Sequence, residues 1–178
     1  MTKTAQATDF VRWFDQVTIE DVLQVGGKNA SLGEMIRELA SFGVKVPNGF
    51  ATTADAYRHF LRQSGLDEQI RLTLAGVRPD DIHNLRQRGG KVRHAILETE
   101  LPDELQESIL GADGHICRER GEVDDVAVGG SATDEDLPDA SFAGRQEAYL
   151  NVRGPTRWLD ACRRCFASLY TGRAMSYR

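Results

Sequence analysis

The chain has 178 residues, of which 40% are hydrophobic, and it carries a formal net charge of -5 at pH 7. This length suits one domain or a lobe of a larger one, and the apolar content excludes wholesale disorder. Acidic and basic residues are interspersed, which argues against a nucleic-acid binder, and no run of about 18 apolar residues predicts a membrane span. The three cysteines are too few for a disulfide framework, and no signal peptide is recognisable, so we expect a cytoplasmic protein.

The N-terminal part of the chain is expected to form a helix followed by a strand. Residues 1–9 are polar and are predicted to be a flexible N-terminus. Apolar residues at helical spacing predict a helix over residues 29–42, with Gly43 as its C-terminal stop. Alternating Val44 and Val46 then predict a short strand.

The middle of the chain is expected to be helical. Thr52 or Thr53 is suited to cap the helix that follows it. Residues 66–122 are interpreted as a more variable helical insert, in which Pro79 and Pro102 lie near the starts of helices. Four apolar residues of this insert fall on one helical face: Leu105, Ile109, Ala112 and Ile116.

The C-terminal part, residues 123–178, is predicted to form a strand, a loop, a second strand and a helix. The first strand begins near Val123, the polar loop covers residues 129–142, and the last helix starts near Pro155. Strands mixed with helices predict an α+β or mixed α/β fold. No terminating glycine or polar tail closes the chain at Arg178, and we interpret this end as a cut within a domain.

The stretch Gly26-Gly27-Lys28 stands directly before the first predicted helix. Glycines let backbone N–H groups approach an anion, and the start of a helix adds unpaired N–H groups and a positive dipole end. Lys28 would add a mobile positive charge for phosphate oxygens. The stretch does not match the P-loop pattern, and taken alone it is also typical of a glycine turn with an exposed lysine.

The polar loop of the C-terminal part carries a second set of candidate ligands. Ser131 and Thr133 supply hydroxyls, which suit phosphate, and the carboxylates that follow suit Mg²⁺. The same composition is also typical of a solvated acidic loop between two strands. The charged and polar residues after Thr133 are Asp134, Glu135, Asp136, Asp139, Arg145, Gln146 and Glu147.

The sequence shows little sign of other site chemistry. Cys162 and Cys165 have the spacing of a redox or zinc half-site, but no second pair lies nearby, which favours two buried thiols on one helical face. The histidines are scattered and form no recognisable catalytic group: His59, His83, His94 and His115.

Both loops lie within blocks that resemble one enzyme family. The blocks, in chain order, read VGGKNASLGEMIRELASFGVKVPNGFATTADAYRHFL, SATDEDLPDASFAGRQEAYLNVRG and RRCFASLYTGRAMSYR. They are similar to the start of phosphoenolpyruvate synthase (pyruvate, water dikinase). Pyruvate phosphate dikinase and rifampin phosphotransferase share the same ATP-binding module and are the next candidates.

The resemblance implies that residues 10–178 are the N-terminal lobe of an ATP-grasp-like nucleotide-binding domain. In the family, this domain transfers a phosphoryl group from ATP to a histidine on a separate domain, which then phosphorylates pyruvate in a barrel domain. ATP ends as AMP and phosphate. The resemblance implies a nucleotide-binding set made of Gly26, Gly27, Lys28, Ser131, Thr133, Arg145, Gln146 and Glu147, with Mg²⁺ ligands in a half of the domain that is absent here.

The chain also departs from the family pattern. Gly129 and Gly130 stand where the family has an arginine and a serine, and Arg145 and Ala148 replace a glutamine and a threonine. Losing a guanidinium removes a bidentate phosphate ligand. Two readings follow: a truncated ATP-binding lobe that is inactive alone, or a non-catalytic remnant that binds little nucleotide. Either would expose apolar surface, so self-association is expected.

Overall fold

The computed structural model describes residues 9–78, 80–120, 125–133 and 148–175. Most of these residues are helical, and they form two small antiparallel sheets, which confirms the α+β class. No helix in these ranges combines the length and the apolarity needed to cross a membrane. The predicted flexible N-terminus lies outside these ranges except for its last residue, and most of the polar loop does too.

In chain order the elements are β1 (Val11–Trp13), the 3-10 helices η1 (Phe14–Gln16) and η2 (Ile19–Asp21), α1 (Val22–Val25), α2 (Gly27–Ser41), β2 (Phe50–Thr52), α3 (Ala54–Gln63), α4 (Leu66–Leu74), α5 (Ile82–Glu98), α6 (Asp103–Arg120), β3 (Val126–Gly129), β4 (Ala148–Val152), α7 (Pro155–Ser168) and α8 (Gly172–Met175). β1 pairs with β2, and β3 pairs with β4.

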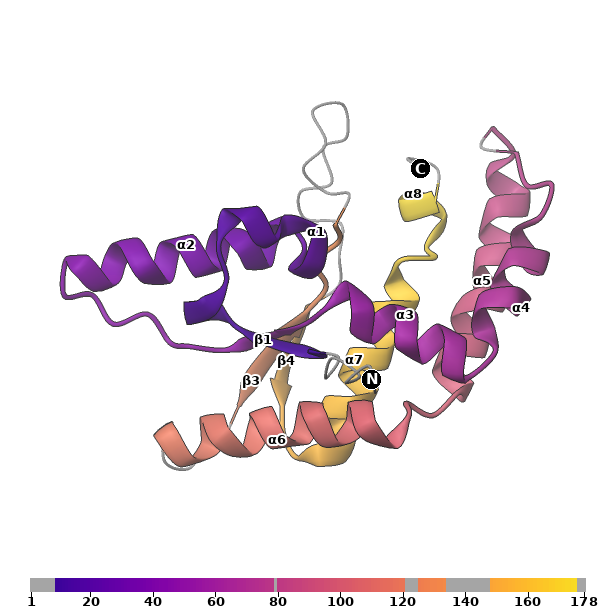
Figure 1. Ribbon diagram of the computed structural model, residues 1–178. Helices are drawn as coiled ribbons and strands as arrows, with labels where there is room; N and C mark the ends of the chain where they lie inside the picture. Colours follow the sequence, from indigo (N-terminus) through magenta and orange to yellow (C-terminus); the bar gives the residue numbers. More distant parts are fainter. Residues whose placement is uncertain (1–8, 79, 121–124, 134–147, 176–178) are drawn as a thin grey trace, which may run out of the picture.

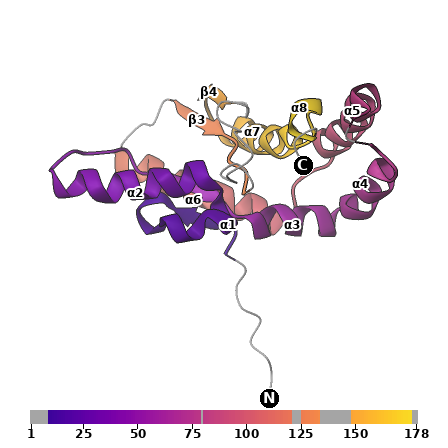
Figure 2. The same cartoon turned by 90° about the horizontal axis from the view of Figure 1, so that it is seen from above.

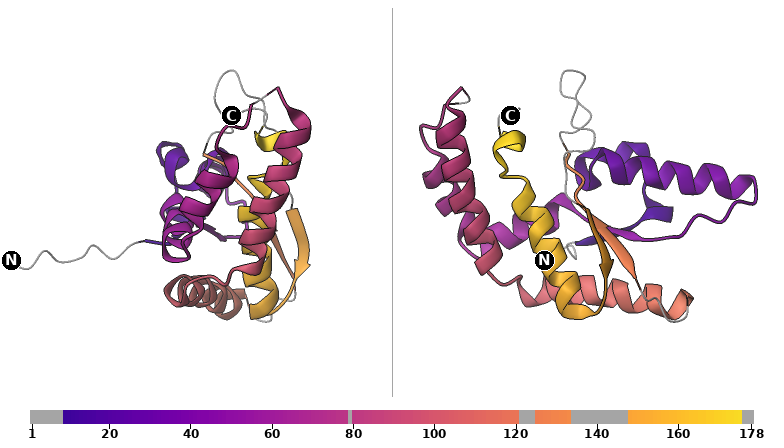
Figure 3. Two further views of the ribbon diagram at one scale, coloured as in Figure 1. Left: turned by 90° about the vertical axis from the view of Figure 1, so that its right-hand side faces the viewer. Right: turned by 180° about the vertical axis from the view of Figure 1, so that it is seen from behind.

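These elements are arranged in two layers. Seen from above, α1, α2 and α3 lie in one layer, while β3, β4, α7 and α8 lie in the other (Figure 2). α6 runs along the lower side of the molecule, and α4 and α5 lie side by side at the end opposite α2 (Figures 1 and 3). The interior between the two layers is therefore bordered by residues from both halves of the chain.

The main core fills the space between α3, α5, α6 and α7. Its largest fully buried side chains include Phe60, Ile96, Leu105 and Ile109. Burying a side chain of this kind stabilises the fold by about 1.5–3 kcal/mol. The predicted apolar face of the insert is confirmed, because all four of its residues are buried in α6.

The predicted helix starts agree with the caps that form. α2 (Gly27–Ser41) begins two residues before the helix predicted over residues 29–42 and ends one residue before its predicted end; Gly43 lies just beyond its cap with a φ of 73°. Thr53, rather than Thr52, caps α3: its hydroxyl accepts a hydrogen bond from the Ala56 N–H at 3.2 Å. The same hydroxyl donates to the Asp9 carbonyl at 2.9 Å, which ties the chain just before β1 to α3.

The strand predicted at Val44 and Val46 is wrong. No strand forms between α2 and β2, and the side chain of Val44 is 49% exposed. An alternating pattern forms a strand only where a partner strand and a buried face are available. These are available further along, at Phe50, which packs edge-on against Trp13 with ring centroids 5.8 Å apart.

Candidate functional site

A cavity of about 640 Å³ lies between the two layers. One wall comes from α2, β2 and α3, and the other from β3, the residues after it and α7. At one end its lining is polar, with Lys28, Asn29 and Ser131. The cavity therefore joins the two loops that the sequence singles out.

The two loops meet at Gly26. This residue precedes α2 with φ 80° and ψ 157°, a conformation that L side chains rarely adopt. A Cβ placed on it would collide with Ser131, whose carbonyl oxygen would lie only 2.8 Å away. The Asn29 N–H in the first turn of α2 donates to the Ser131 hydroxyl at 3.4 Å. Glycine at position 26 thus allows two segments 102 residues apart to make direct contact.

Lys28 lies beside the paired glycines. Its Nζ is 3.0 Å from the point that a Cβ on Gly129 would occupy. The lysine is exposed and stands in the first turn of α2, where the helix dipole is positive. A flexible ammonium, a helix start and a hydroxyl loop therefore converge on one end of the cavity, which is a suitable environment for an anion.

The predicted site residues are only partly within the described chain. Lys28, Ser131 and Thr133 line the cavity. Gly26 and Gly27 are buried directly behind them. The remaining predicted residues, Arg145, Gln146 and Glu147, lie outside the described ranges. Among the residues that are described, no group of three or more His, Cys, Asp or Glu side chains is placed to hold a metal ion.

The other end of the cavity is aromatic, which the sequence reading missed. Phe50 stacks on Trp158 with ring centroids 5.6 Å apart and planes 10° apart, and both line the cavity together with Tyr57 and Phe166. The helical spacing of Trp158 and Phe166 indicates that they lie on one face of a helix, but this spacing does not show that the face borders a cavity. An apolar aromatic wall suits a planar ring, so the cavity as a whole fits a ligand with one planar and one anionic end.

A pair of tyrosines connects the cavity to the far layer. The Tyr57 and Tyr170 hydroxyls are 2.7 Å apart and share a hydrogen bond. Arg93 of α5 donates to the Tyr170 carbonyl at 2.6 Å, so the end of α7 is held from two sides. The cavity wall is therefore supported by α5 as well as by its own core packing.

The cysteine pair of α7 also borders the cavity. Cys162 is buried, with 7% of its surface exposed, and Cys165 is half-buried. Burial, and to a smaller extent the neighbouring Cys165, raise the pKa of the Cys162 thiol to about 12. Cys162 is therefore a neutral thiol at physiological pH.

Two of the histidines, His59 and His115, pack against aromatic rings. The ring of His59 forms a hydrogen bond with the Glu104 carboxylate at 2.8 Å and packs 4.7 Å from the ring of Phe10. His115 lies edge-on to Trp13 at 4.9 Å. Neither arrangement places a base beside a nucleophile.

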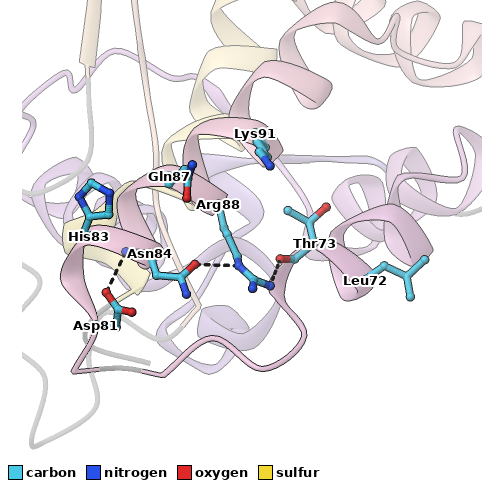
Figure 4. A pocket seen from close by; sticks show the side chains of 8 residues that line it. All are labelled: Leu72, Thr73, Asp81, His83, Asn84, Gln87, Arg88 and Lys91. Atoms are coloured by element: carbon cyan, nitrogen blue, oxygen red, sulfur yellow. Dashed lines mark hydrogen bonds between the residues drawn. The ribbon is translucent and has the colours of Figure 1, made fainter.

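A second cavity, of about 540 Å³, opens between α4 and α5 on the outside of the molecule (Figure 4). Arg88 lies across it and donates to the carbonyls of Thr73 and Ala75 at 2.9 and 2.8 Å, and to the Asn84 side chain at 2.7 Å. The guanidinium thus ties the end of α4 to α5. Arg88 already uses these hydrogen bonds to join the two helices, so this cavity is a weaker candidate for a ligand site.

Comparison with known proteins identifies one family. The family model described as pyruvate phosphate dikinase, AMP/ATP-binding domain, matches residues 22–178. Phosphoenolpyruvate synthases from Synechocystis sp., Aquifex aeolicus and Escherichia coli K12 are 49%, 50% and 47% identical to this chain. The alignments cover 96%, 94% and 97% of this chain, but only 22%, 20% and 22% of the relatives. The chain thus spans about a fifth of the length of these relatives.

Proposed function

Because the chain belongs to the AMP/ATP-binding domain family of pyruvate phosphate dikinase, we propose that it binds ATP in the cavity between its two layers. The phosphates would lie at the polar end, beside Lys28 and the loop of Ser131 and Thr133. The adenine ring would lie toward Phe50 and Trp158. The contact of Gly26 with Ser131 carries this proposal, because it brings both glycine-bearing loops to one end of one cavity.

The proposal extends to the reaction of the longer relatives, whose name is phosphoenolpyruvate synthase. In such an enzyme, this lobe of an ATP-grasp-like domain would hold ATP in the cytoplasm while a phosphoryl group moves to a histidine on a separate domain and then to pyruvate. Phosphoryl transfer depends mainly on positioning and charge stabilisation. The lobe would supply positioning through Lys28 and the hydroxyl loop, with Arg145, Gln146 and Glu147 as further ligands. Alone it would not complete the reaction.

Mg²⁺ is part of this proposal only as a partner of ATP. Among the described residues, no three His, Cys, Asp or Glu side chains are placed together to hold a metal ion. Mg²⁺ usually keeps several waters and is bound by few carboxylates together with phosphates. Its protein ligands are expected in the complementary half of the domain.

The first test is titration of the chain with ATP by calorimetry, with the variant Lys28→Ala. A hydrogen bond to a charged group contributes about 1.5–3 kcal/mol, so we expect roughly 10-fold to 100-fold weaker binding. Lys45→Ala is the matched control, because Lys45 is also exposed but does not line the cavity. Equal affinity of the wild type and Lys28→Ala would remove Lys28 from the site.

A second candidate function is a non-catalytic domain with little affinity for nucleotide. Gly129 favours it, because no side chain extends from the position beside Lys28 where the family carries an arginine. The double variant Gly129→Arg with Gly130→Ser separates the two functions. The new Cβ would press only on the flexible end of Lys28, at 3.0 Å, so the fold can accommodate it.

We expect the double variant to bind ATP more tightly, because a guanidinium adds a bidentate phosphate contact. The matched control is Gly129→Leu with Gly130→Ser, which adds bulk without charge. A rise in affinity confined to the arginine variant supports an intact nucleotide site. No rise in either variant would support the non-catalytic alternative.

A further inference from the structure

Two thiols lie together in the α7 wall of the cavity. Cys162 and Cys165 both line it, and Cys162 is at the same time part of the main core. Cys162 is more than nine-tenths buried and its sulfur makes no hydrogen bond among the described contacts. A buried thiol without a hydrogen-bond partner on a cavity wall is an available ligand.

The spacing of the pair suits a group that takes two sulfur ligands. Side chains at positions i and i+3 of a helix are neighbours, with Cβ atoms about 5–6 Å apart. Cys165 also contributes to the raised pKa of Cys162, which agrees with this spacing. A group that bridges both sulfurs would therefore need little change in α7.

The surroundings limit which group this can be. Zinc in structural sites takes four protein ligands, and the described residues provide no third His, Cys, Asp or Glu beside the pair. A soft, thiophilic centre that needs only two thiolate ligands does not require a third protein ligand, so the pair alone is sufficient for it. A trivalent organic arsenical is one example, because its own carbon substituent fills the third position.

We propose that Cys162 and Cys165 form a dithiol site on the cavity wall that binds thiophilic centres through both sulfurs, with trivalent organic arsenicals as the representative ligands. The site requires no nucleotide, although it lies on the wall of the same cavity in which ATP is proposed to bind. A cavity of about 640 Å³ has the volume of a site for a small organic ligand, so an aryl substituent has room beside the pair.

The reaction with phenylarsine oxide balances without an oxidant. The half-buried Cys165 reacts first and forms one As–S bond, and Cys162 then forms the second within the same complex. The bonding between arsenic and oxygen breaks. The two thiol protons move to that oxygen, which leaves as water. Arsenic remains trivalent and keeps its phenyl group.

The test uses the full chain with Cys117→Ser, so that only the pair can react. We expect one phenylarsine oxide to bind per chain, with loss of both titratable thiols of the pair, as measured by native mass spectrometry and thiol titration. Excess of a monothiol should leave the complex intact, whereas a dithiol such as dithiothreitol should release the arsenical. This pattern is specific to coordination by two sulfurs.

The single variants Cys162→Ala and Cys165→Ala test whether both sulfurs are needed. We expect each to lose the arsenical to excess monothiol, with at least about 10-fold weaker retention, because one sulfur replaces a chelating pair. Circular dichroism of each variant verifies that α7 has formed. Retention by either folded variant equal to that of the pair would overturn the proposal, and so would survival of two free thiols in the complex.

Discussion

Gly26 allows the stretch that contains Lys28 and the loop that contains Ser131 to make contact. A second glycine, Gly154, allows the effect of this contact on stability and binding to be measured. Gly154 precedes α7 with φ 78° and ψ 160°, nearly the same dihedral angles as Gly26 before α2. A Cβ on Gly154 would have no atom within 4 Å, whereas a Cβ on Gly26 would collide with Ser131. The two positions therefore share the backbone conformation and differ in the contact.

We predict that Gly26→Ala destabilises the chain more than Gly154→Ala does. Both changes place a side chain at positive φ, which costs on the order of 1–2 kcal/mol. Only the change at Gly26 also forces the loop of Ser131 away, and it should therefore weaken ATP binding as well. Urea denaturation and ATP titration of both variants measure the two effects. Equal loss of stability and unchanged affinity would show that the loop contact has no role in binding.

The contact at Gly26 could not be predicted from the sequence. A glycine before a helix is compatible with a plain turn, and nothing local in the stretch shows which distant backbone lies against it. The charge of Lys28 and the hydroxyl of Ser131 are local properties, and these were identified as candidates. Their convergence depends on how two segments 102 residues apart pack, which no spacing encodes.

At the scale of elements, α5 contains two adjacent glycines, Gly89 and Gly90, whose surroundings differ: one lies against another segment and the other does not. A Cβ on Gly89 would collide with the Tyr170 carbonyl and the end of Met175, which belong to the α7–α8 segment. A Cβ on Gly90 would meet only the tip of Arg93, at 3.8 Å. Gly89 is thus the point of close approach between α5 and the cavity wall.

We predict opposite signs for alanine at these two positions. Gly90→Ala should stabilise the chain by about 0.5–1 kcal/mol, because alanine favours the helix and nothing obstructs it. Gly89→Ala should destabilise it by about 1–3 kcal/mol, the usual cost of overpacking. Chemical denaturation of the two variants measures the difference. Stabilisation by both would mean that α8 moves away from α5 at no cost.

Elements that rest on local pattern were predicted well, and elements that depend on a partner were not. The periodic apolar residues of α6 specify its buried face, and Pro155 marks the start of α7. In α2 the periodicity predicted the helix but not its buried face, which consists of Gly27, Ala30 and Gly33. The strand expected at Val44 did not form, whereas β1, which carries no clear alternation, did. A strand is stabilised by the chain that pairs with it, and that partner is not visible in a short stretch of sequence.

At the scale of the whole molecule, apolar side chains remain on the surface at one end. α2 and the segment after it extend away from the rest of the molecule (Figure 1). Phe42, at the end of this helix, is 79% exposed, and Val44 is 49% exposed. Mixed helices and strands predict the α+β class, but the pattern of a single chain does not show which apolar faces stay uncovered.

We predict that the chain associates with itself through this end. Burying a phenylalanine side chain contributes about 1.5–3 kcal/mol, which favours association at high protein concentration. Phe42→Ser should shift the sedimentation profile toward monomer. Leu72→Ser is the control, because Leu72 is 59% exposed on α4, at the other end. A wild-type chain that sediments as a monomer at high concentration would contradict the prediction.

The two halves of α2 differ in burial, and therefore in the free energy needed to open them locally. Ala30 and Gly33, in the first half of the helix, are buried, whereas most residues from Met35 onward are exposed. Local opening requires less free energy where fewer contacts are lost. Amide hydrogens near Ser41 should therefore exchange with solvent faster than those of the buried residues Ala30 and Gly33. We expect the helix to open first at its far end and last near Lys28, which lines the cavity.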